Sequence, residues 1–112
     1  MALKVILSPA ARRDVEEIWR FIAEQDSVEN ADKVLEAFQD AIKGLENLPQ
    51  RGNIPKELRA FGNTGYREIH QNPYRIIYRI GVATVNIHGV FDGRRNMQIL
   101  LQRRLLKLPR PK

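Results

Sequence analysis

Apolar residues recur with a helical period over the first half of the chain. A first apolar face follows the spacing i, i+3, i+4, i+7, and consists of Val15, Ile18, Trp19 and Ile22. Ser8-Pro9 precedes this face, and serine suits the N-cap while proline suits the first helical position, where its missing N–H costs nothing. The pattern therefore predicts an amphipathic helix that begins at Pro9.

A second helix shows the clearest periodicity in the sequence. Ser27 is its predicted cap, and its apolar face comprises Ala31, Val34, Leu35, Phe38, Ile42 and Leu45. We expect Pro49 to end this helix and the residues around Gln25-Asp26 to join the two helices as an antiparallel hairpin. Residues 49–64 are rich in proline and glycine, which predicts a connecting loop.

The period then changes from helical to two-fold. Strands are predicted over residues 66–70, 74–80 and 84–91, with turns at Asn72-Pro73 and Gly81. Residues 3–7 form a further short strand. Three consecutive strands make an antiparallel meander, the N-terminal strand can pair at its edge, and the helical hairpin covers one face. The predicted fold is a single α+β domain with the order β-α-α-β-β-β and a C-terminal helix.

Alternation along the strands predicts which side chains share a face. In the middle strand, the side that packs on the helices should hold Tyr74, Ile76, Tyr78 and Ile80. The opposite, open face should present Arg75, Ile77 and Arg79. In the last strand, one face should hold Val85, Ile87, Gly89 and Phe91, opposite Asn86 and His88.

Charge is distributed unevenly along the chain. Residues 1–48 carry six Lys/Arg against ten Asp/Glu, a net of −4, and residues 49–112 carry thirteen against three, a net of +10, which sums to the overall +6. This asymmetry indicates a positive surface that attracts polyanions or an acidic partner. A merely solvated basic surface is the alternative.

The pattern from Asn96 to Pro109 predicts a basic amphipathic helix. Its apolar side holds Met97, Leu100, Leu101, Leu105 and Leu108, with Arg103, Arg104 and Lys107 between them, and Pro109 ends it. We expect it to pack on the domain, to engage a partner helix, or to contact DNA held by the target. No apolar run approaches the ~20 residues of a membrane span. With no signal peptide and no cysteine, the chain is expected to be cytoplasmic, without membrane contact or cofactor.

These elements and their local sequences resemble a known family. The matching segments are Leu7-Ser8-Pro9-Ala10-Ala11-Arg12-Arg13-Asp14-Val15, Ile18-Trp19-Arg20-Phe21-Ile22, Leu45-Glu46-Asn47-Leu48-Pro49-Gln50-Arg51-Gly52, Gly65-Tyr66-Arg67-Glu68, Pro73-Tyr74-Arg75-Ile76-Ile77-Tyr78-Arg79 and Val90-Phe91-Asp92-Gly93-Arg94-Arg95. In order and spacing they resemble the RelE/ParE superfamily of toxins, in its ParE-like, plasmid-stabilisation branch. Residues 1–95 would form the toxin domain, and residues 96–112 a basic extension of the same domain.

The resemblance implies the toxin of a type II toxin–antitoxin pair. Its antitoxin would wrap the toxin with a C-terminal segment, forming a hetero-oligomer, and would bind operator DNA with its N-terminal part. In the ParE-like branch the target is DNA gyrase. In the RelE-like branch the toxin cleaves messenger RNA in the ribosomal A site, through attack of a 2′-OH on the phosphate.

The residues favour binding over catalysis. A ribonuclease needs a base, an acid and cations around the phosphate. Arginines are plentiful, but the candidates for proton transfer are few, namely Glu68, His70 and His88. No Tyr or His follows His88, and the turn Asp92-Gly93-Arg94-Arg95 lacks the histidine that ParE-like relatives often have there.

We therefore expect a ParE-like toxin that inhibits DNA gyrase and has neither a catalytic centre nor a metal site. The predicted target- or antitoxin-binding residues are Arg67, Arg75, Arg79, Arg94, Arg95, Arg103 and Arg104. DNA contact would come through the antitoxin or the gyrase complex. The alternative is a RelE-like mRNA endonuclease in which Arg75 and Arg79 stabilise phosphate. A third hypothesis is a relative that has lost toxicity and serves as a binding partner or repressor element.

Overall fold

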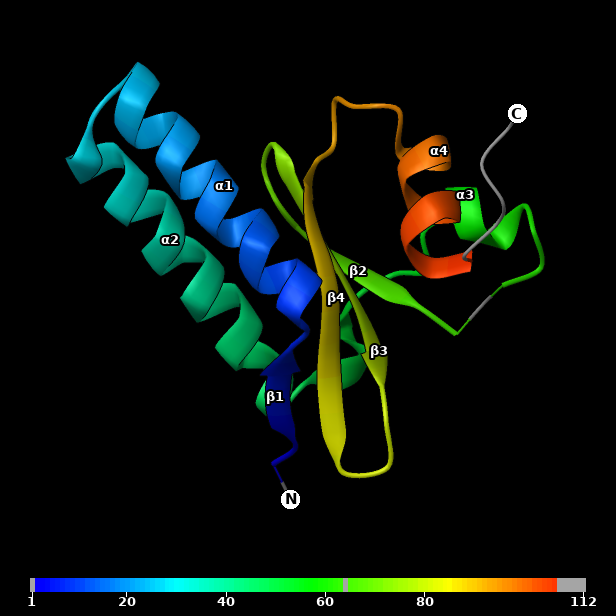
Figure 1. Ribbon diagram of the computed structural model, residues 1–112. Helices are drawn as coiled ribbons and strands as arrows, with labels where there is room; N and C mark the ends of the chain where they lie inside the picture. The colour runs from blue at the N-terminus through cyan, green and yellow to red at the C-terminus, as the bar shows by residue number, and fades with distance from the viewer. Residues whose placement is uncertain (1, 64, 107–112) are drawn as a thin grey trace.

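The computed structural model describes residues 2–63 and 65–106, and its helical hairpin matches the prediction (Figure 1). Helix α1 spans Pro9–Gln25, and the Ser8 hydroxyl accepts a 3.0 Å hydrogen bond from the Ala11 N–H. Helix α2 spans Val28–Lys43 and is capped in the same way by Ser27, at 3.0 Å from the Asn30 nitrogen. Both predicted N-caps are thus confirmed.

The segment after α2 is more structured than the sequence indicated. The α-helix ends at Lys43 rather than at Pro49, and a 3₁₀ turn, η1 (Gly44–Glu46), carries Leu45 into the core. A second 3₁₀ turn, η2, covers Pro49–Arg51. The predicted loop 49–64 also contains a short helix, α3 (Lys56–Arg59), which helical periodicity could not reveal because it has a single turn.

Four strands form one sheet in the order β1-β4-β3-β2. Their bounds are β1 (Lys4–Leu7), β2 (Arg67–Gln71), β3 (Tyr74–Ile80) and β4 (Thr84–Asp92). Strands β2, β3 and β4 are the predicted antiparallel meander, and β1 pairs parallel to β4 at its edge. The predicted α+β architecture is confirmed.

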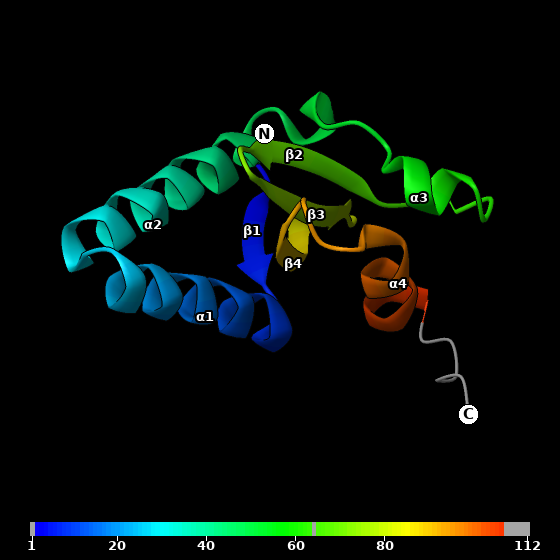
Figure 2. The ribbon, with the colours of Figure 1, turned by 90° about the horizontal axis from the view of Figure 1, so that it is seen from above.

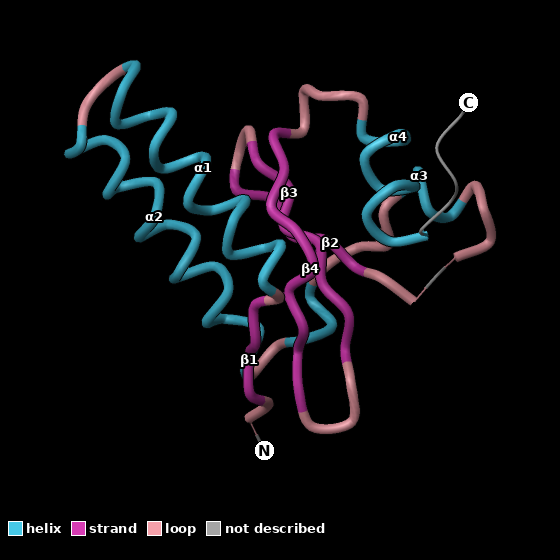
Figure 3. Tube along the Cα trace, viewed as in Figure 1, coloured by secondary structure: helices cyan, strands magenta, loops and turns pink. Residues whose placement is uncertain are grey.

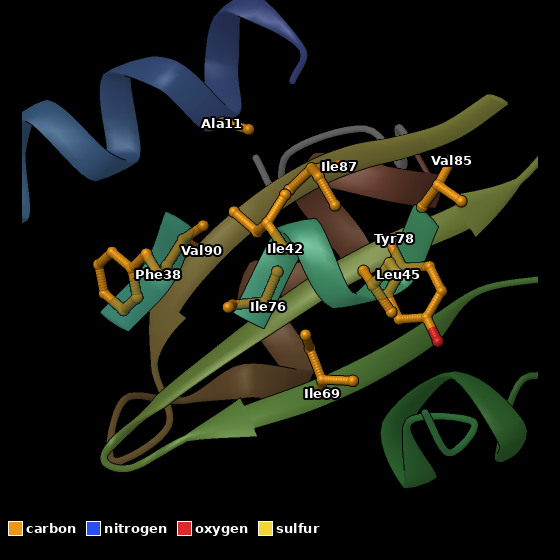
Figure 4. Close-up of a cluster of buried hydrophobic side chains, with 10 residues drawn as sticks. All are labelled: Ala11, Phe38, Ile42, Leu45, Ile69, Ile76, Tyr78, Val85, Ile87 and Val90. Carbon is orange, nitrogen blue, oxygen red and sulfur yellow. The ribbon is translucent and has the colours of Figure 1, made fainter. Parts of the chain in front are cut away.

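Helices α1 and α2 cover the first face of the sheet (Figure 2). The buried cluster there comprises Ala11, Phe38, Ile42, Leu45, Ile69, Ile76, Tyr78, Val85, Ile87 and Val90 (Figure 4). Tyr74 and Ile80 pack against it, so the predicted helix-facing side of β3 is correct. Burial of this apolar surface against the helices is the main stabilising contribution of the layer.

The alternation predicted for β4 is wrong beyond Ile87. In the register between β3 and β4, Ile77 pairs with Gly89 but Tyr78 pairs with Ile87, so His88 is an extra, bulged residue. The bulge shifts the following side chains to the other face. Val90 therefore joins the first cluster, whereas Phe91 lies in a second cluster on the opposite face.

The second face of the sheet is not open, contrary to the prediction. Helix α4 (Met97–Leu101) and the π-helical turn η3 (Gln102–Leu106) lie beside α3 on this side (Figure 3). The cluster that they cover comprises Leu58, Tyr66, Ile77, Phe91, Met97 and Leu101. The sheet is thus the middle layer of three, and only parts of its second face reach the solvent. No helix among the described residues is both long and apolar enough to cross a membrane.

Candidate functional site

The seven predicted binding arginines have very different surroundings in the structure. Arg75, Arg94 and Arg104 form ion pairs with carboxylates. Arg67 donates to the carbonyl oxygens of Gly52 (2.8 Å) and Gln50 (3.4 Å) and so holds the loop before α3. Arg79, Arg95 and Arg103 are exposed. Charge alone does not distinguish these roles, because each depends on neighbours from other elements.

Arg75 lies in a nearly buried ionic network that ties α3 to the sheet. Its guanidinium binds the Glu57 carboxylate at 2.9 and 2.7 Å and also contacts both oxygens of Glu68, whose side chain is 3% exposed. The Asn53 amide donates to Glu68 at 3.1 Å, and His70 Nε2 lies 3.3 Å from the same carboxylate. The hydrogen bond from Arg75 holds the pKa of Glu57 below its usual value. This network is saturated with internal partners.

Arg104 anchors the C-terminal segment to α1 and β4. Its guanidinium binds the Asp14 carboxylate at 3.0 and 2.9 Å, donates to the His88 carbonyl at 3.2 Å, and lies 4.9 Å from the centre of the Phe91 ring. Asp14 also accepts from the Val90 N–H at 3.1 Å, next to the bulge. The predicted Lys107, Leu108 and Pro109 lie outside the described residues.

A groove between α1 and the end of β4 holds the Arg94-Arg95 turn, and we call it the Arg95 groove. It is lined by Asp14, Glu17, Ile18, Phe21, Tyr74, Val90, Phe91, Asp92, Arg94 and Arg95. Arg94 binds Asp92 at 2.6 Å, and hydrogen bonding from Arg94 lowers the pKa of Asp92. Phe21 is 64% exposed. Exposed aromatic and arginine side chains are the types that dominate binding at protein interfaces.

A second hollow, the Arg79 groove, crosses the second face where β1, β4 and β3 lie side by side. It is lined by Ile6, Ser8, Arg79, Ile80, Gly81, Asn86 and His88. The Arg79 guanidinium lies 5.6 Å from the centre of the Tyr66 ring, and His88 packs edge-to-face on Tyr66 at 5.4 Å. Burial, with the nearby charges of Arg79 and Arg104, lowers the pKa of His88 and favours its neutral form.

A third, apolar groove runs along the helical hairpin beside β1. Its lining includes Val5, Leu7, Val15, Leu35 and Phe38. It adjoins a further hollow at Trp19, whose indole N–H donates to Asp32 at 2.9 Å. Helical periodicity identified the side chains of this stripe as core, but the structure leaves some of their surface at the solvent.

Of the three predicted proton-transfer residues, Glu68 and His70 lie together, and His88 lies apart from them. Glu68 and His70 belong to the Arg75 network, whereas His88 lines the Arg79 groove, whose lining includes neither of them. Among the described residues, no group of three or more His, Asp and Glu side chains could hold a metal ion. His88 is the one histidine among the residues that line the Arg79 groove, and no Asp or Glu lines this groove.

Comparison with known proteins places this geometry in a class. The fold is similar to that of a chain in the chromosomal ParDE toxin–antitoxin system of P. aeruginosa, with a TM-score of 0.70, 15% identity, and coverage of 81% of this chain and 96% of the other. The RelBE2 toxin–antitoxin complex of Mycobacterium tuberculosis contains a chain with a TM-score of 0.55, 24% identity, and coverage of 82% and 99%. The chain therefore shares its fold with chains of these two toxin–antitoxin systems.

The sequence is similar to toxins of the ParE family. Toxin ParE1 of Mycobacterium tuberculosis is 30% identical over 95 residues, which cover 84% of this chain and 93% of the relative. Toxin ParE3 of Caulobacter vibrioides is 26% identical over 94 residues, which cover 84% and 90%. The family described as "ParE toxin of type II toxin-antitoxin system, parDE" matches residues 5–97, and the chain belongs to this family.

Proposed function

We propose that this chain stops growth by binding DNA gyrase, without catalysis of its own, and that a cognate antitoxin neutralises it in the cytoplasm. Membership of the ParE toxin family supports the toxin class. The observation that carries the binding mode is the Arg95 groove, where exposed Phe21 lies near the Arg94-Arg95 turn. An aromatic anchor beside guanidinium groups is suited to a protein target.

The distribution of titratable groups supports a non-enzymatic toxin. General acid–base cleavage of RNA requires a proton acceptor and a donor within hydrogen-bond reach of one phosphate. Glu68 is nearly buried and bonded to Arg75 and Asn53, so it is not available to a substrate. His88 lines a different hollow. A RelE-like nuclease would have to obtain its second proton-transfer group elsewhere.

The apolar groove beside β1 is our candidate for the antitoxin's C-terminal segment. Its lining exposes aliphatic and aromatic surface from α1, α2 and β1. An amphipathic segment can bury such a stripe, since apolar anchors at helical spacing fit a groove of this kind. This groove and the Arg95 groove have no lining residue in common, so the proposed antitoxin site and target site are separate.

The proposal is tested by inducing the chain without its antitoxin and measuring DNA and protein synthesis over the first minutes. We expect thymidine incorporation to fall first, and purified gyrase to lose supercoiling activity when the protein is added. The double variant Arg94→Ala/Arg95→Ala should weaken both effects by about tenfold or more, because hot-spot residues contribute above 1–2 kcal/mol each.

The matched control is Arg12→Ala/Arg13→Ala, which removes two adjacent, exposed arginines from the start of α1. This control should retain full toxicity with the same loss of charge. Equal toxicity of the wild type and the Arg94/Arg95 variant would show that the Arg95 groove is the wrong site. An early fall in methionine incorporation with continuing DNA synthesis would replace gyrase by mRNA as the target.

A further inference from the structure

The last part of β4 has no neighbouring strand on the β1 side among the residues that the structure describes. β1 pairs with β4 as far as Leu7 and Ile87, whereas β4 continues to Asp92, with α1 beside this last part (Figure 1). The Ser8 N–H still reaches the Ile87 carbonyl, at 3.0 Å. Backbone groups beyond Ile87 on this side need other partners, because an unpaired polar group in a buried position costs free energy.

Two charged side chains from distant parts of the chain supply these partners. The Val90 N–H donates to the Asp14 carboxylate at 3.1 Å, and the His88 carbonyl accepts from the Arg104 guanidinium at 3.2 Å. Asp14 and Arg104 also bind each other at 3.0 and 2.9 Å, and their side chains are 14% and 27% exposed. This ion pair thus takes the place of a strand at the bulge, where the pairing of β4 is already interrupted.

The same ion pair belongs to the wall of the Arg95 groove. Asp14 lines the groove together with Val90, to which it is bonded. Phe91 also lines the groove, and the Arg104 guanidinium lies 4.9 Å from the centre of its ring. A single ion pair therefore joins α1, β4 and η3 at this wall.

The two binding elements of the groove lie on different segments. Phe21 belongs to α1 and follows Asp14 by seven residues, so that both lie on one face of the helix, two turns apart. The Arg94-Arg95 turn follows the end of β4, and both of its N–H groups donate to Asp92, at 2.9 and 3.1 Å. These bonds fix the turn relative to β4 but not relative to Phe21. The spacing across the groove depends on how α1 is held against β4.

We propose that Asp14 and Arg104 are positioning residues for target binding, because their ion pair holds α1 against the end of β4. The pair thereby sets the spacing between Phe21 and the Arg94-Arg95 turn. This inference rests on the function proposed above, since it concerns the same groove. Arg104 acts through Asp14 and Phe91 and needs no contact with the target. An aromatic anchor and a cation on separate segments bind one partner well when their spacing is fixed beforehand, because less ordering is needed on binding.

The first test compares the wild type with Asp14→Ala and Arg104→Met in inhibition of gyrase supercoiling by the purified chain. Each variant should raise the concentration for half-inhibition by about tenfold, the scale of coupling between residues in contact. Because the two residues act as one unit, the double variant should be no weaker than either single variant. Circular dichroism shows whether each variant keeps the fold.

Matched controls remove a similar charge elsewhere on the surface. Glu24→Ala replaces an exposed acid of α1, and Arg59→Met replaces an exposed arginine of α3, and neither residue lines the Arg95 groove. Both controls should change the half-inhibition value by less than about twofold, because surface substitutions away from specific contacts have small effects. A loss in these controls as large as in the two test variants would overturn the inference, since overall charge would then explain the result.

Hydrogen exchange of backbone amides, followed by NMR, distinguishes positioning from a general loss of stability. The amides of Arg94 and Arg95 are bonded to Asp92 and not to the replaced side chains. In both test variants they should exchange faster by about threefold or more, while amides of the buried Ile76 and Tyr78 keep their protection. Equally faster exchange throughout the sheet would contradict the inference, because the pair would then only stabilise the fold.

The two proposals fail in different ways. If the wild-type chain leaves gyrase active, the proposed function is wrong, and the exchange data still decide whether the ion pair holds the Arg94-Arg95 turn. If the wild type inhibits gyrase and both test variants inhibit it equally well, the function stands and the positioning role is wrong. Unchanged exchange at Arg94 and Arg95 in both variants would also overturn the positioning role.

Discussion

Arg75 and Arg79 lie four residues apart on β3 and point to the same face of the sheet, yet their surroundings are opposite. Arg75 is 12% exposed and bound to two carboxylates. Arg79 is exposed and stacked on an aromatic ring in a groove without acids. On this one strand, Arg75 thus stabilises the fold, whereas the guanidinium of Arg79 is available for binding.

The difference arises from what the rest of the chain places over each end of the second face. Helix α3 brings Glu57 onto Arg75, while β2 brings Glu68. At the other end, the bulge at His88 and the edge strand β1 leave a hollow. A guanidinium that finds internal acceptors becomes part of the core, and one that finds none keeps its capacity for ligands.

The largest expected effect that tests this contrast is on stability. Arg75→Met should reduce the free energy of unfolding by about 3 kcal/mol, because it leaves the nearly buried Glu68 carboxylate without its cation. Arg79→Met should change it by less than about 0.5 kcal/mol, since no buried partner is orphaned. Urea denaturation at neutral pH measures both values. Similar losses in the two variants would remove the distinction between a structural and a binding arginine.

A smaller effect is expected from the Glu57 carboxylate. Its pKa is below the ordinary 4.5 in the folded state, so its contribution is present above that pH and is lost as the pH falls through the folded pKa. Glu57→Gln should cost about 1–2 kcal/mol at pH 7 and flatten the acid limb of the stability curve. The exposed Glu36→Gln on α2 is the control and should leave the curve unchanged. If the acid limb of the stability curve is unaltered in the Glu57 variant, a carboxyl group other than Glu57 causes the loss of stability at low pH.

The smallest expected effect is a change in the pKa of His88, which should respond to the loss of Arg79 but not to the loss of Arg75. Its folded pKa lies below the ordinary 6.5, so stability should fall as the pH drops below 6.5 through the folded pKa. Arg79→Met removes one of the charges that lower this pKa and should therefore raise it. Arg75 is not among the causes, so Arg75→Met should leave it in place. NMR titration of the His88 ring protons distinguishes these outcomes.

The sequence predicted most of the first face of the sheet. Helical and two-fold periods identified both helices of the hairpin, their serine caps, and the side of β3 that packs on them. These features are local, because a cap bonds within one turn and alternation follows from the backbone of a single strand. Family resemblance then supplied the class of protein, which the comparisons confirm.

The second face could not be predicted in this way. A one-residue bulge at His88 reversed the sides of Val90 and Phe91, and alternation contains no signal for an inserted residue. The single-turn helix α3 was read as loop, so the partner of Arg75 was missed, although Glu57 is one of only three acids after residue 48. The scarcity of acids in this arginine-rich half was the signal in the sequence that Glu57 could pair with an arginine.

The sequence by itself determined the helical hairpin and the four strands, their order, the first core layer and the basic character of the second half, because these follow from local periodicity and composition. Only the tertiary structure decided which arginines are neutralised and which remain available. That outcome depends on distances between side chains from different elements, such as Glu57 to Arg75 and Asp14 to Arg104. Electrostatic roles are set by those contacts and by burial, neither of which is encoded in residue type or spacing.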